Sequence, residues 1–242
     1  HHGFWKYCDP VHPKYVPGNP FEHVFRDYYS AVDSKIGELI AIAGDSVSTI
    51  VVSDHGAKAM RGGLRVNQWL IDHGYLRLKD TPAAGTRFED CAVDWPNARA
   101  WSSGGYYARV FLNVQGREPE GCVPPSDYEC TRDEIVAGIS SIKGRNDGPL
   151  NNRVLKPEEI YLQTNGIAPD LIVYPDDLNW RAIGTVGHDS IYADENDIGP
   201  DDANHDYNGI FISSEKMVSP PRTVLDVAPG LLNRFGISRK SS

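Results

Sequence analysis

The residues best suited to metal chemistry begin with Asp54 and His55, in the phrase Ser53-Asp54-His55-Gly56. They directly follow residues 48–52 (STIVV), a short β-branched run typical of a strand that is buried on both faces of a parallel sheet. In open α/β sheets, ligands bind beyond the carboxyl ends of the strands. An adjacent carboxylate and imidazole suit Zn²⁺, Mn²⁺ or Fe²⁺. The alternative is that Asp54 caps the next helix and His55 lies exposed in solvent.

Two further histidines stand in unusual contexts. His205 ends residues 199–205 (GPDDANH), inside a stretch rich in Asp and Glu that either binds a hard cation or forms a solvated surface. His2 belongs to the opening phrase of residues 1–7 (HHGFWKY). The first two histidines resemble a tag remnant, but the phrase continues directly without linker residues. Both alternatives remain open on the sequence alone.

The order of apolar patterns predicts the elements that position these residues. Apolar residues recur at helical spacing from Val24 to Ile40, with Asn19 suited to cap the helix and Gly44 to end it. A second capping box is expected at Thr131-x-x-Glu134. Helices are also expected over 64–73 and 226–235, with strands at 110–114 and 171–174. A helix, a buried strand and a polar loop in this order indicate an α/β fold.

The composition of the 242 residues excludes several classes of protein. A net charge of −9 argues against a partner that is a nucleic-acid polymer, because phosphate contacts need clustered Lys and Arg. No apolar run approaches the roughly 20 residues that span a bilayer, and no signal peptide is recognisable, so neither a membrane association nor export is expected. Four sparse cysteines are typical of reduced thiols in a cytoplasmic protein, although a Cys122–Cys130 disulfide remains open.

Several blocks together resemble one protein family. The blocks are VVSDHG (51–56), the opening HHGFWKY, FLNVQGREP (111–119), GPDDANH, the aromatic block 94–107 and residues 223–229. They resemble the alkaline phosphatase superfamily, in its type I phosphodiesterase/nucleotide pyrophosphatase branch, often labelled phosphohydrolase/phosphomutase. The resemblance implies an alkaline-phosphatase-like α/β fold with a mostly parallel central sheet flanked by helices. It further implies that residues 1–242 are the C-terminal part of one catalytic domain, here incomplete, with loop-rich insertions around 79–130 and 184–209.

The resemblance also implies a mechanism and a ligand set. Such enzymes hydrolyse phosphate esters with two divalent metal ions, most often Zn²⁺ (Mn²⁺ is the alternative), beside a Thr or Ser nucleophile. Asp54 and His55 match the ligands of one ion, and His2 and His205 match ligands of the other. The nucleophile and further ligands would precede His1, so the chain alone is expected to be inactive and to pair with the missing N-terminal half of its domain. The expected substrate is a small phosphorylated molecule, with a nucleotide-like one as a candidate.

The sequence also allows other functions for this chain. The chain is alternatively a non-catalytic α/β binding module, a degenerate family member, or a phosphomutase or sulfatase of the same superfamily. Residues that contact substrate are not identified by the sequence. Arginines and aromatic side chains are candidates for contacts to phosphate and to a base, with surface ion pairs and core packing as the alternatives. These candidates are Arg61, Arg65, Arg99, Arg109, Trp95, Trp101, Tyr106 and Tyr107.

Overall fold

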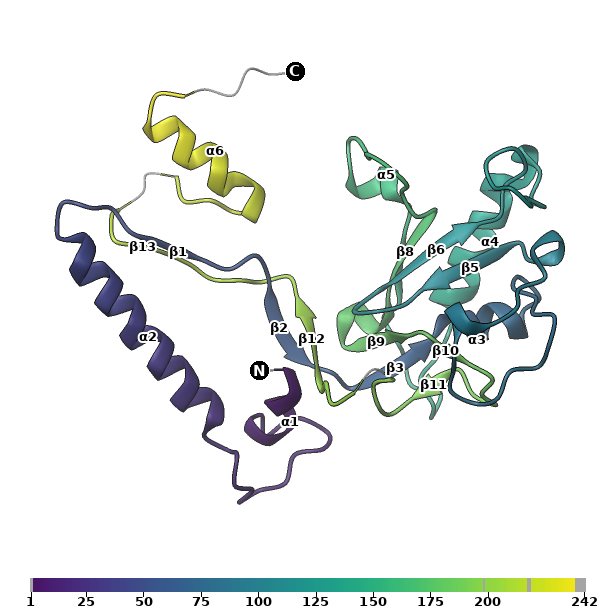
Figure 1. Ribbon diagram of the computed structural model, residues 1–242, viewed down its shortest axis with the longest axis horizontal. Helices are drawn as coiled ribbons and strands as arrows, with labels where there is room; N and C mark the ends of the chain where they lie inside the picture. The colour runs from purple at the N-terminus through teal and green to yellow at the C-terminus, as the bar shows by residue number, and fades with distance from the viewer. Residues whose placement is uncertain (1, 198, 217–218, 238–242) are drawn as a thin grey trace. The chain divides into compact units, whose positions relative to one another are not determined.

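The computed structural model describes residues 2–197, 199–216 and 219–237, and it confirms a mixed α/β fold. The chain forms two compact units, a larger one of His1–Glu22 with Lys58–Asn204 and a smaller one of His23–Ala57 with His205–Ser242. The chain passes between the units along two paired strands, β2 (Gly56–Ala59) and β12 (Ala203–Asp206), labelled in Figure 1. Each unit is described by itself.

The larger unit is built around a four-stranded sheet in the order β5-β6-β8-β7. Its strands are β5 (Ala100–Ser103), β6 (Ala108–Leu112), β8 (Leu171–Tyr174) and β7 (Arg153–Leu155). Along β6, Ala108, Val110 and Leu112 are fully buried, whereas Arg109 and Phe111 point to the opposite face. This alternation follows from the two-residue period of a strand. The buried face belongs to the same core as apolar side chains of α3 (Val66–Asp72) and α4 (Tyr128–Ser140).

Smaller elements complete the larger unit. A three-stranded sheet has the order β11-β3-β9, and β10 pairs with β4. The strands are β3 (Gly62–Arg65), β4 (Thr86–Arg87), β9 (Trp180–Ile183), β10 (Thr185–Val186) and β11 (Tyr192–Ala193). The short helices are η1 (His2–Phe4), α1 (Trp5–Cys8), η2 (Phe88–Asp90), η3 (Trp95–Asn97), η4 (Pro125–Asp127), α5 (Pro157–Ile160) and η5 (Pro175–Leu178). The expected loop-rich stretch 184–209 therefore contains three short strands.

The strand directions differ from the mostly parallel sheet that we expected. In the four-stranded sheet every pairing is antiparallel, and β3–β9 is a parallel pair. For β5 and β6 the reason lies in the connection, because only residues 104–107 join them. A parallel pair needs a crossover of a dozen or more residues, so this short link forces a hairpin.

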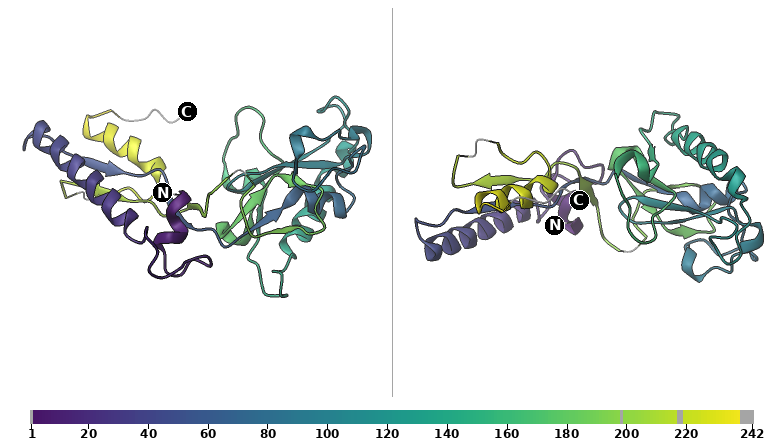
Figure 2. Two further views of the ribbon diagram at one scale, coloured as in Figure 1. Left: turned by 60° about the horizontal axis from the view of Figure 1, so that its bottom comes forward. Right: turned by 90° about the horizontal axis from the view of Figure 1, so that it is seen from above.

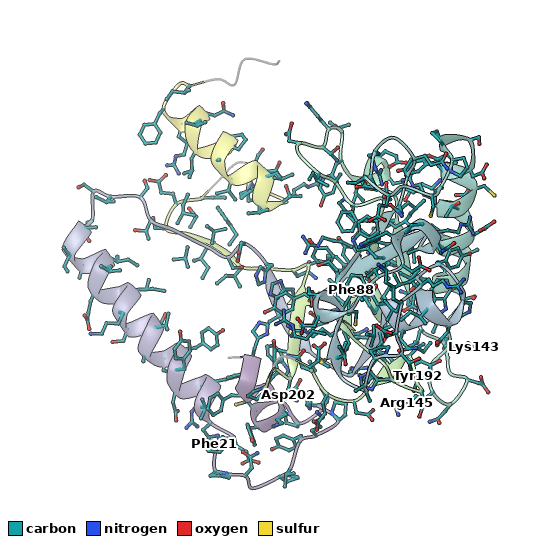
Figure 3. The ribbon with its side chains drawn as sticks, turned by 45° about the vertical axis from the view of Figure 1, so that its right-hand side comes forward. Phe21, Phe88, Lys143, Arg145, Tyr192 and Asp202 are labelled. Carbon is teal, nitrogen blue, oxygen red and sulfur yellow. The ribbon has the colours of Figure 1, made fainter. Side chains whose placement is uncertain are left out.

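The smaller unit consists of two helices and a two-stranded ribbon. These are α2 (Val24–Ala43), α6 (Val224–Arg234), and β1 (Ile50–Val52) paired antiparallel with β13 (Phe211–Ser213). The ribbon can be followed from two further directions in Figure 2. In Figure 3, side chains crowd the larger unit and project outward from α2 and α6. No described residue of either helix is buried, and the apolar side chains of α2 expected to face a core lie exposed or half-exposed.

The expectation that residues 48–52 form a strand buried on both faces is wrong. The strand is shorter, and Val52 is 44% exposed. Within the described residues β1 pairs only with β13, and no third strand extends the ribbon. A two-stranded ribbon cannot bury both of its faces by itself.

Two expected helix starts also differ, because the capping side chains find other partners. Asn19 Oδ1 accepts a hydrogen bond from the backbone N–H of Phe21 at 2.9 Å, which forms a turn, and α2 begins only at Val24. Thr131 lies buried inside α4, where its hydroxyl accepts a hydrogen bond from Arg99 at 2.7 Å. Gly44 ends α2 as expected, with a φ of 82° that favours glycine.

Two further expectations concern cysteines and membranes. All four cysteines are free, so the Cys122–Cys130 disulfide is not formed. Among the described helices, none combines the length and the apolar character that crossing a bilayer requires.

Candidate functional site

Asp54 and His55 lie in the smaller unit, between β1 and β2. His55 Nδ1 is 2.8 Å from the carbonyl oxygen of Gly56. A carbonyl oxygen only accepts, so Nδ1 is the donor in this contact, and Nε2 is the ring nitrogen that remains for a metal ion. Asp54 Oδ1 lies 3.7 Å from this Nε2. No helix follows Asp54, because the chain continues directly into β2. The structure therefore excludes a helix cap at Asp54. It places Asp54 Oδ1 and His55 Nε2, two atoms that can bind a metal ion, close to each other.

His205 is brought to the same place by the pairing of β2 with β12. Its imidazole stacks on that of His55, with ring centroids 3.9 Å apart and planes 17° apart. Gly56 makes this approach possible, since a Cβ at that position would overlap the carbonyl oxygen of Asn208. Three of the four ligands expected from sequence, Asp54, His55 and His205, are thus gathered in one unit.

Asp54 and His55 have the donor types and the spacing of two ligands of one divalent metal ion. Bonds of roughly 2.0–2.2 Å to a tetrahedral zinc ion put neighbouring donor atoms about 3.4 Å apart, close to the Asp54–His55 separation. The hydrogen bond at Nδ1 is the arrangement that usually orients a metal-binding histidine. Among the described residues, no group of three or more His, Cys, Asp or Glu side chains converges on a single point. A complete ligand shell is therefore not formed by these residues alone.

His2 lies in the larger unit, where Asp201 orients it. His2 Nδ1 is 2.9 Å from Asp201 Oδ1, and Asp201 also accepts a hydrogen bond from Arg181, whose side chain is only 3% exposed. The guanidinium of Arg181 lies over the Tyr106 ring, 4.4 Å from its centroid. Burial by itself would raise the pKa of Asp201, but the hydrogen bond and charge of Arg181, followed by those of His2, lower it. The ionised carboxylate fixes Nδ1 as the donor, as the Gly56 carbonyl does for His55.

The separation between His2 and the His55–His205 pair stays a prediction, because these residues belong to different units. His1 lies outside the described residues. The sequence pattern did not reveal Asp201 and Arg181 as partners of His2. The available signal was a lone arginine in the otherwise apolar strand β9, since a buried guanidinium needs an anionic partner.

Two carboxylates of the acidic stretch around His205 bond to the protein's own groups. Asp202 pairs with Lys6 at 3.1 Å and with Lys14 at 3.4 Å. Asp197 Oδ2 accepts hydrogen bonds from the backbone N–H groups of residues 184 and 185. Asp197 and Asp202 therefore anchor the loop and the opening segment, whereas the side chains of Asp194 and Glu195 are 76% and 83% exposed, as in a solvated charge run.

Three of the four arginines proposed as phosphate contacts bond through their side chains within the larger unit, and for Arg61 the described residues show only a bond of its backbone N–H to the Asn179 carbonyl oxygen. Arg65 donates to two carbonyl oxygens of residues 190 and 192, Arg99 donates to Thr131, and Arg109 donates to Ser103. The aromatic candidates pack on one another or on charged side chains: Trp95 on Trp101, Trp101 on Phe111, Tyr106 on Arg181 and Tyr107 on Tyr174.

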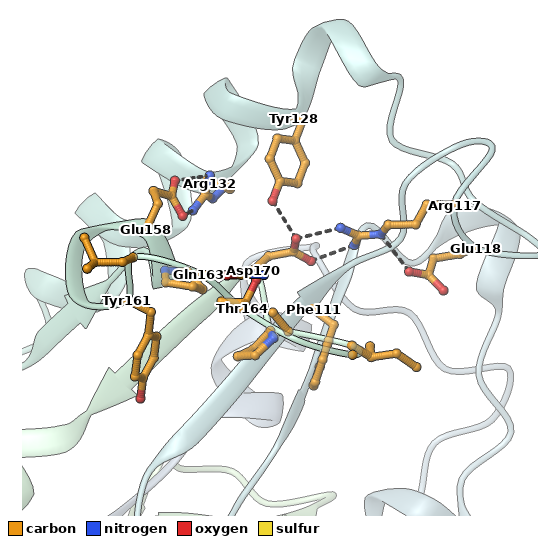
Figure 4. Close-up of a pocket in the computed structure, with 16 residues that line it drawn as sticks. Phe111, Arg117, Glu118, Tyr128, Arg132, Glu158, Tyr161, Gln163, Thr164 and Asp170 are labelled. Carbon is orange, nitrogen blue, oxygen red and sulfur yellow. Dashed lines mark hydrogen bonds and ion pairs between the residues drawn. The ribbon is translucent and has the colours of Figure 1, made fainter. Parts of the chain in front are cut away.

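A cavity of about 730 Å³ beside α4 contains a buried polar cluster that sequence reasoning missed (Figure 4). Asp170 is 3% exposed, and its carboxylate accepts a hydrogen bond from each terminal guanidinium nitrogen of Arg117, both at 2.7 Å. It also accepts hydrogen bonds from the Tyr128 hydroxyl and from the Leu112 backbone N–H, each at 2.6 Å. Burial, and then the hydrogen bond to Asp170, raise the pKa of Tyr128 to about 12. Every oxygen of Asp170 is thus used inside the fold.

The comparisons with known proteins agree with the sequence blocks. A family model described as type I phosphodiesterase / nucleotide pyrophosphatase matches residues 1–205. No curated protein matches, and no solved structure matches. The matched segment contains His2, Asp54, His55 and His205. The chain therefore belongs to the type I phosphodiesterase/nucleotide pyrophosphatase family, a branch of the alkaline phosphatase superfamily.

Proposed function

We propose that this chain contributes ligands to a two-metal site that hydrolyses phosphate esters. Asp54 and His55 hold one ion, and His205 and His2 belong to the ligand set of the other. Imidazole and carboxylate donors suit Zn²⁺, with Mn²⁺ as the second choice. When bound, two such ions lower the pKa of the attacking oxygen and neutralise the transferring phosphoryl group. The substrate class is a small phosphate diester or pyrophosphate, with a nucleotide as one candidate.

The observation that carries the proposal is the stacked pair of His55 and His205. Two nearly parallel imidazoles cannot both direct a ring nitrogen in their own planes at one ion between them. They can each bind one of two neighbouring ions, and their 3.9 Å spacing equals the roughly 3.5–4 Å between metals in two-metal sites. The role of Asp54 and His55 is thus to fix one ion, while His205 places the next beside it.

The nucleophile is expected on a segment that precedes His1, together with the remaining ligands. The exposed apolar side chains of α2, α6 and the β1–β13 ribbon support a partner for the smaller unit, since apolar surface of this extent is normally buried. We propose that the N-terminal half of the same domain covers this surface. The chain by itself is then a weak metal binder without turnover.

Two measurements test the proposed function. Zinc binding to the 242-residue chain is measured by competition with a chromogenic chelator, and hydrolysis of bis-p-nitrophenyl phosphate is measured for a polypeptide that also carries the preceding residues. We expect zinc to bind the chain, and turnover of the longer polypeptide to be lost on metal removal and restored by zinc. Absence of bound metal and of turnover in the longer polypeptide would instead support the non-catalytic binding module.

Asp201→Asn is expected to weaken zinc binding about tenfold in the longer polypeptide that also carries the preceding residues. The reason is that the neutral amide of Asn orients the His2 imidazole less firmly than the carboxylate of Asp201 does. The matched control is Asp202→Asn, which removes the same charge and breaks the ion pairs to Lys6 and Lys14 but leaves the His2 imidazole partner in place. Thermal unfolding of both variants separates a loss of stability from a loss of metal affinity. Equal zinc affinities of the two variants would contradict the orienting role of Asp201.

A further inference from the structure

The block FLNVQGREP (111–119) takes no part in the proposed metal site, yet it builds a second, smaller cavity. This cavity has a volume of about 240 Å³ and lies within the larger unit. Its wall consists of Trp95, Trp101, Asn113, Glu118, Pro119 and Glu120. Two tryptophans and two glutamates therefore contribute to the wall of one small cavity.

The aromatic part of the wall is a corner of two indoles. The rings of Trp95 and Trp101 lie 5.1 Å apart and are inclined by 80°. Trp101 is backed by Phe111, whose ring is stacked on it at 5.5 Å. Both tryptophans are only half-buried, so part of each indole remains accessible to a molecule in the cavity.

A single amide holds the two sides of this cavity together. Asn113 is 2% exposed, and its Nδ2 donates to the carbonyl oxygens of Trp95 at 2.8 Å, Ala98 at 3.0 Å and Glu120 at 2.9 Å. The turn is also tightly closed at Gly121, where a Cβ would overlap the carbonyl oxygen of Val114. The wall is therefore formed before any ligand arrives, which lowers the entropic cost of binding.

The charges around the cavity favour a cation. Glu118 Oε1 is 2.9 Å from Arg117 Nε, and the other edge of Arg117 is engaged by Asp170. Glu120 is exposed and makes no ion pair in the part of the chain that the structure describes. Glu118 and Asp170 thus share the guanidinium of Arg117, whereas Glu120, a residue of the cavity wall, has no cation paired with it among the described residues. An anionic ligand would be repelled here.

We propose that this cavity binds a small organic cation that carries a methylated ammonium group. The methyl groups would lie against the indoles of Trp95 and Trp101, where the positive charge is attracted by the aromatic faces. Glu120 supplies the opposite charge at the rim. A neutral molecule of the same shape gains only the apolar contact, and an unmethylated ammonium retains its hydration more strongly.

The test is a calorimetric titration of the 242-residue chain with choline, compared with 3,3-dimethylbutan-1-ol, the neutral molecule of the same shape. EDTA is present throughout, so the result does not depend on the proposed metal site. We expect saturable choline binding that is about tenfold or more tighter than binding of the alcohol. Equal binding of both molecules, or no saturable choline binding at tens of millimolar, overturns the proposal.

Two variants test the assignment to this cavity. Glu120→Gln is expected to weaken choline binding about threefold or more and to leave binding of the alcohol unchanged. Glu89→Gln is the matched control, since Glu89 is an exposed glutamate of the same unit that pairs only with Arg87 across 3.6 Å. Trp95→Leu is expected to weaken the binding of both molecules. If Glu89→Gln reduces choline binding as much as Glu120→Gln does, only the overall charge matters and the site is refuted.

Discussion

Replacing His55 by alanine is expected to weaken zinc binding to the chain by more than about 100-fold. His55 is oriented by its own backbone, through the hydrogen bond from Nδ1 to Gly56, and it stands 3.7 Å from the carboxylate of Asp54. In a site with few ligands each donor carries a large share of the affinity, because a single remaining ligand holds the ion no better than an unfolded chain does. The variant leaves Asp54 as the only donor at that position.

The measurement is competition with a chromogenic chelator, together with the number of zinc ions bound per chain. His23→Ala is the matched control, since His23 is an exposed histidine of the same unit. Because the side chain of His55 lies 41% exposed, its removal is not expected to unfold the unit, and circular dichroism checks this. Unchanged zinc affinity in His55→Ala, or an equal loss in His23→Ala, would remove the basis of the proposed two-metal site.

The parts of the site that could be predicted from sequence are those encoded locally. A β-branched run followed by Asp54-His55 places the pair at the end of a strand, and the structure has the pair there. The contact between His55 and His205 could not be predicted from local sequence, because it depends on the pairing of two strands from distant parts of the chain. The family resemblance supplied that contact; residue spacing did not.

What could not be predicted depends on partners that are far apart in the sequence. Asp201 and His2 are separated by 199 positions, and Asp170 and Arg117 by 53. Nothing in the local pattern distinguishes these carboxylates from solvated ones. The same reason explains the missed helix start at Thr131, whose hydroxyl bonds to Arg99, 32 positions away. At Asn19 the competing bond is local, because its side chain accepts from the backbone N–H of Phe21 in a turn.

The long-range pair in the larger unit leads to the second large effect. Asp170→Ala is expected to reduce the free energy of unfolding of this unit by about 3 kcal/mol. The substitution leaves the Tyr128 hydroxyl and the Leu112 N–H without an acceptor and deprives Arg117 of a bidentate partner. We place the effect at the lower end for a buried pair, because the Arg117 side chain is 43% exposed and can turn toward water.

Urea denaturation followed by near-ultraviolet circular dichroism measures this loss, and hydrogen exchange at the Leu112 amide locates it. Glu118→Gln is the control: it removes the other carboxylate that contacts Arg117, but this pair lies nearer the surface, so a loss below about 1 kcal/mol is expected. A double-mutant cycle with Arg117→Ala separates the coupling of the pair from the cost of each truncation. Were Asp170→Ala to cost no more than Glu118→Gln, the four hydrogen bonds to Asp170 would contribute nothing beyond what water supplies. The apolar core alone would then have to hold the end of β6 against α4.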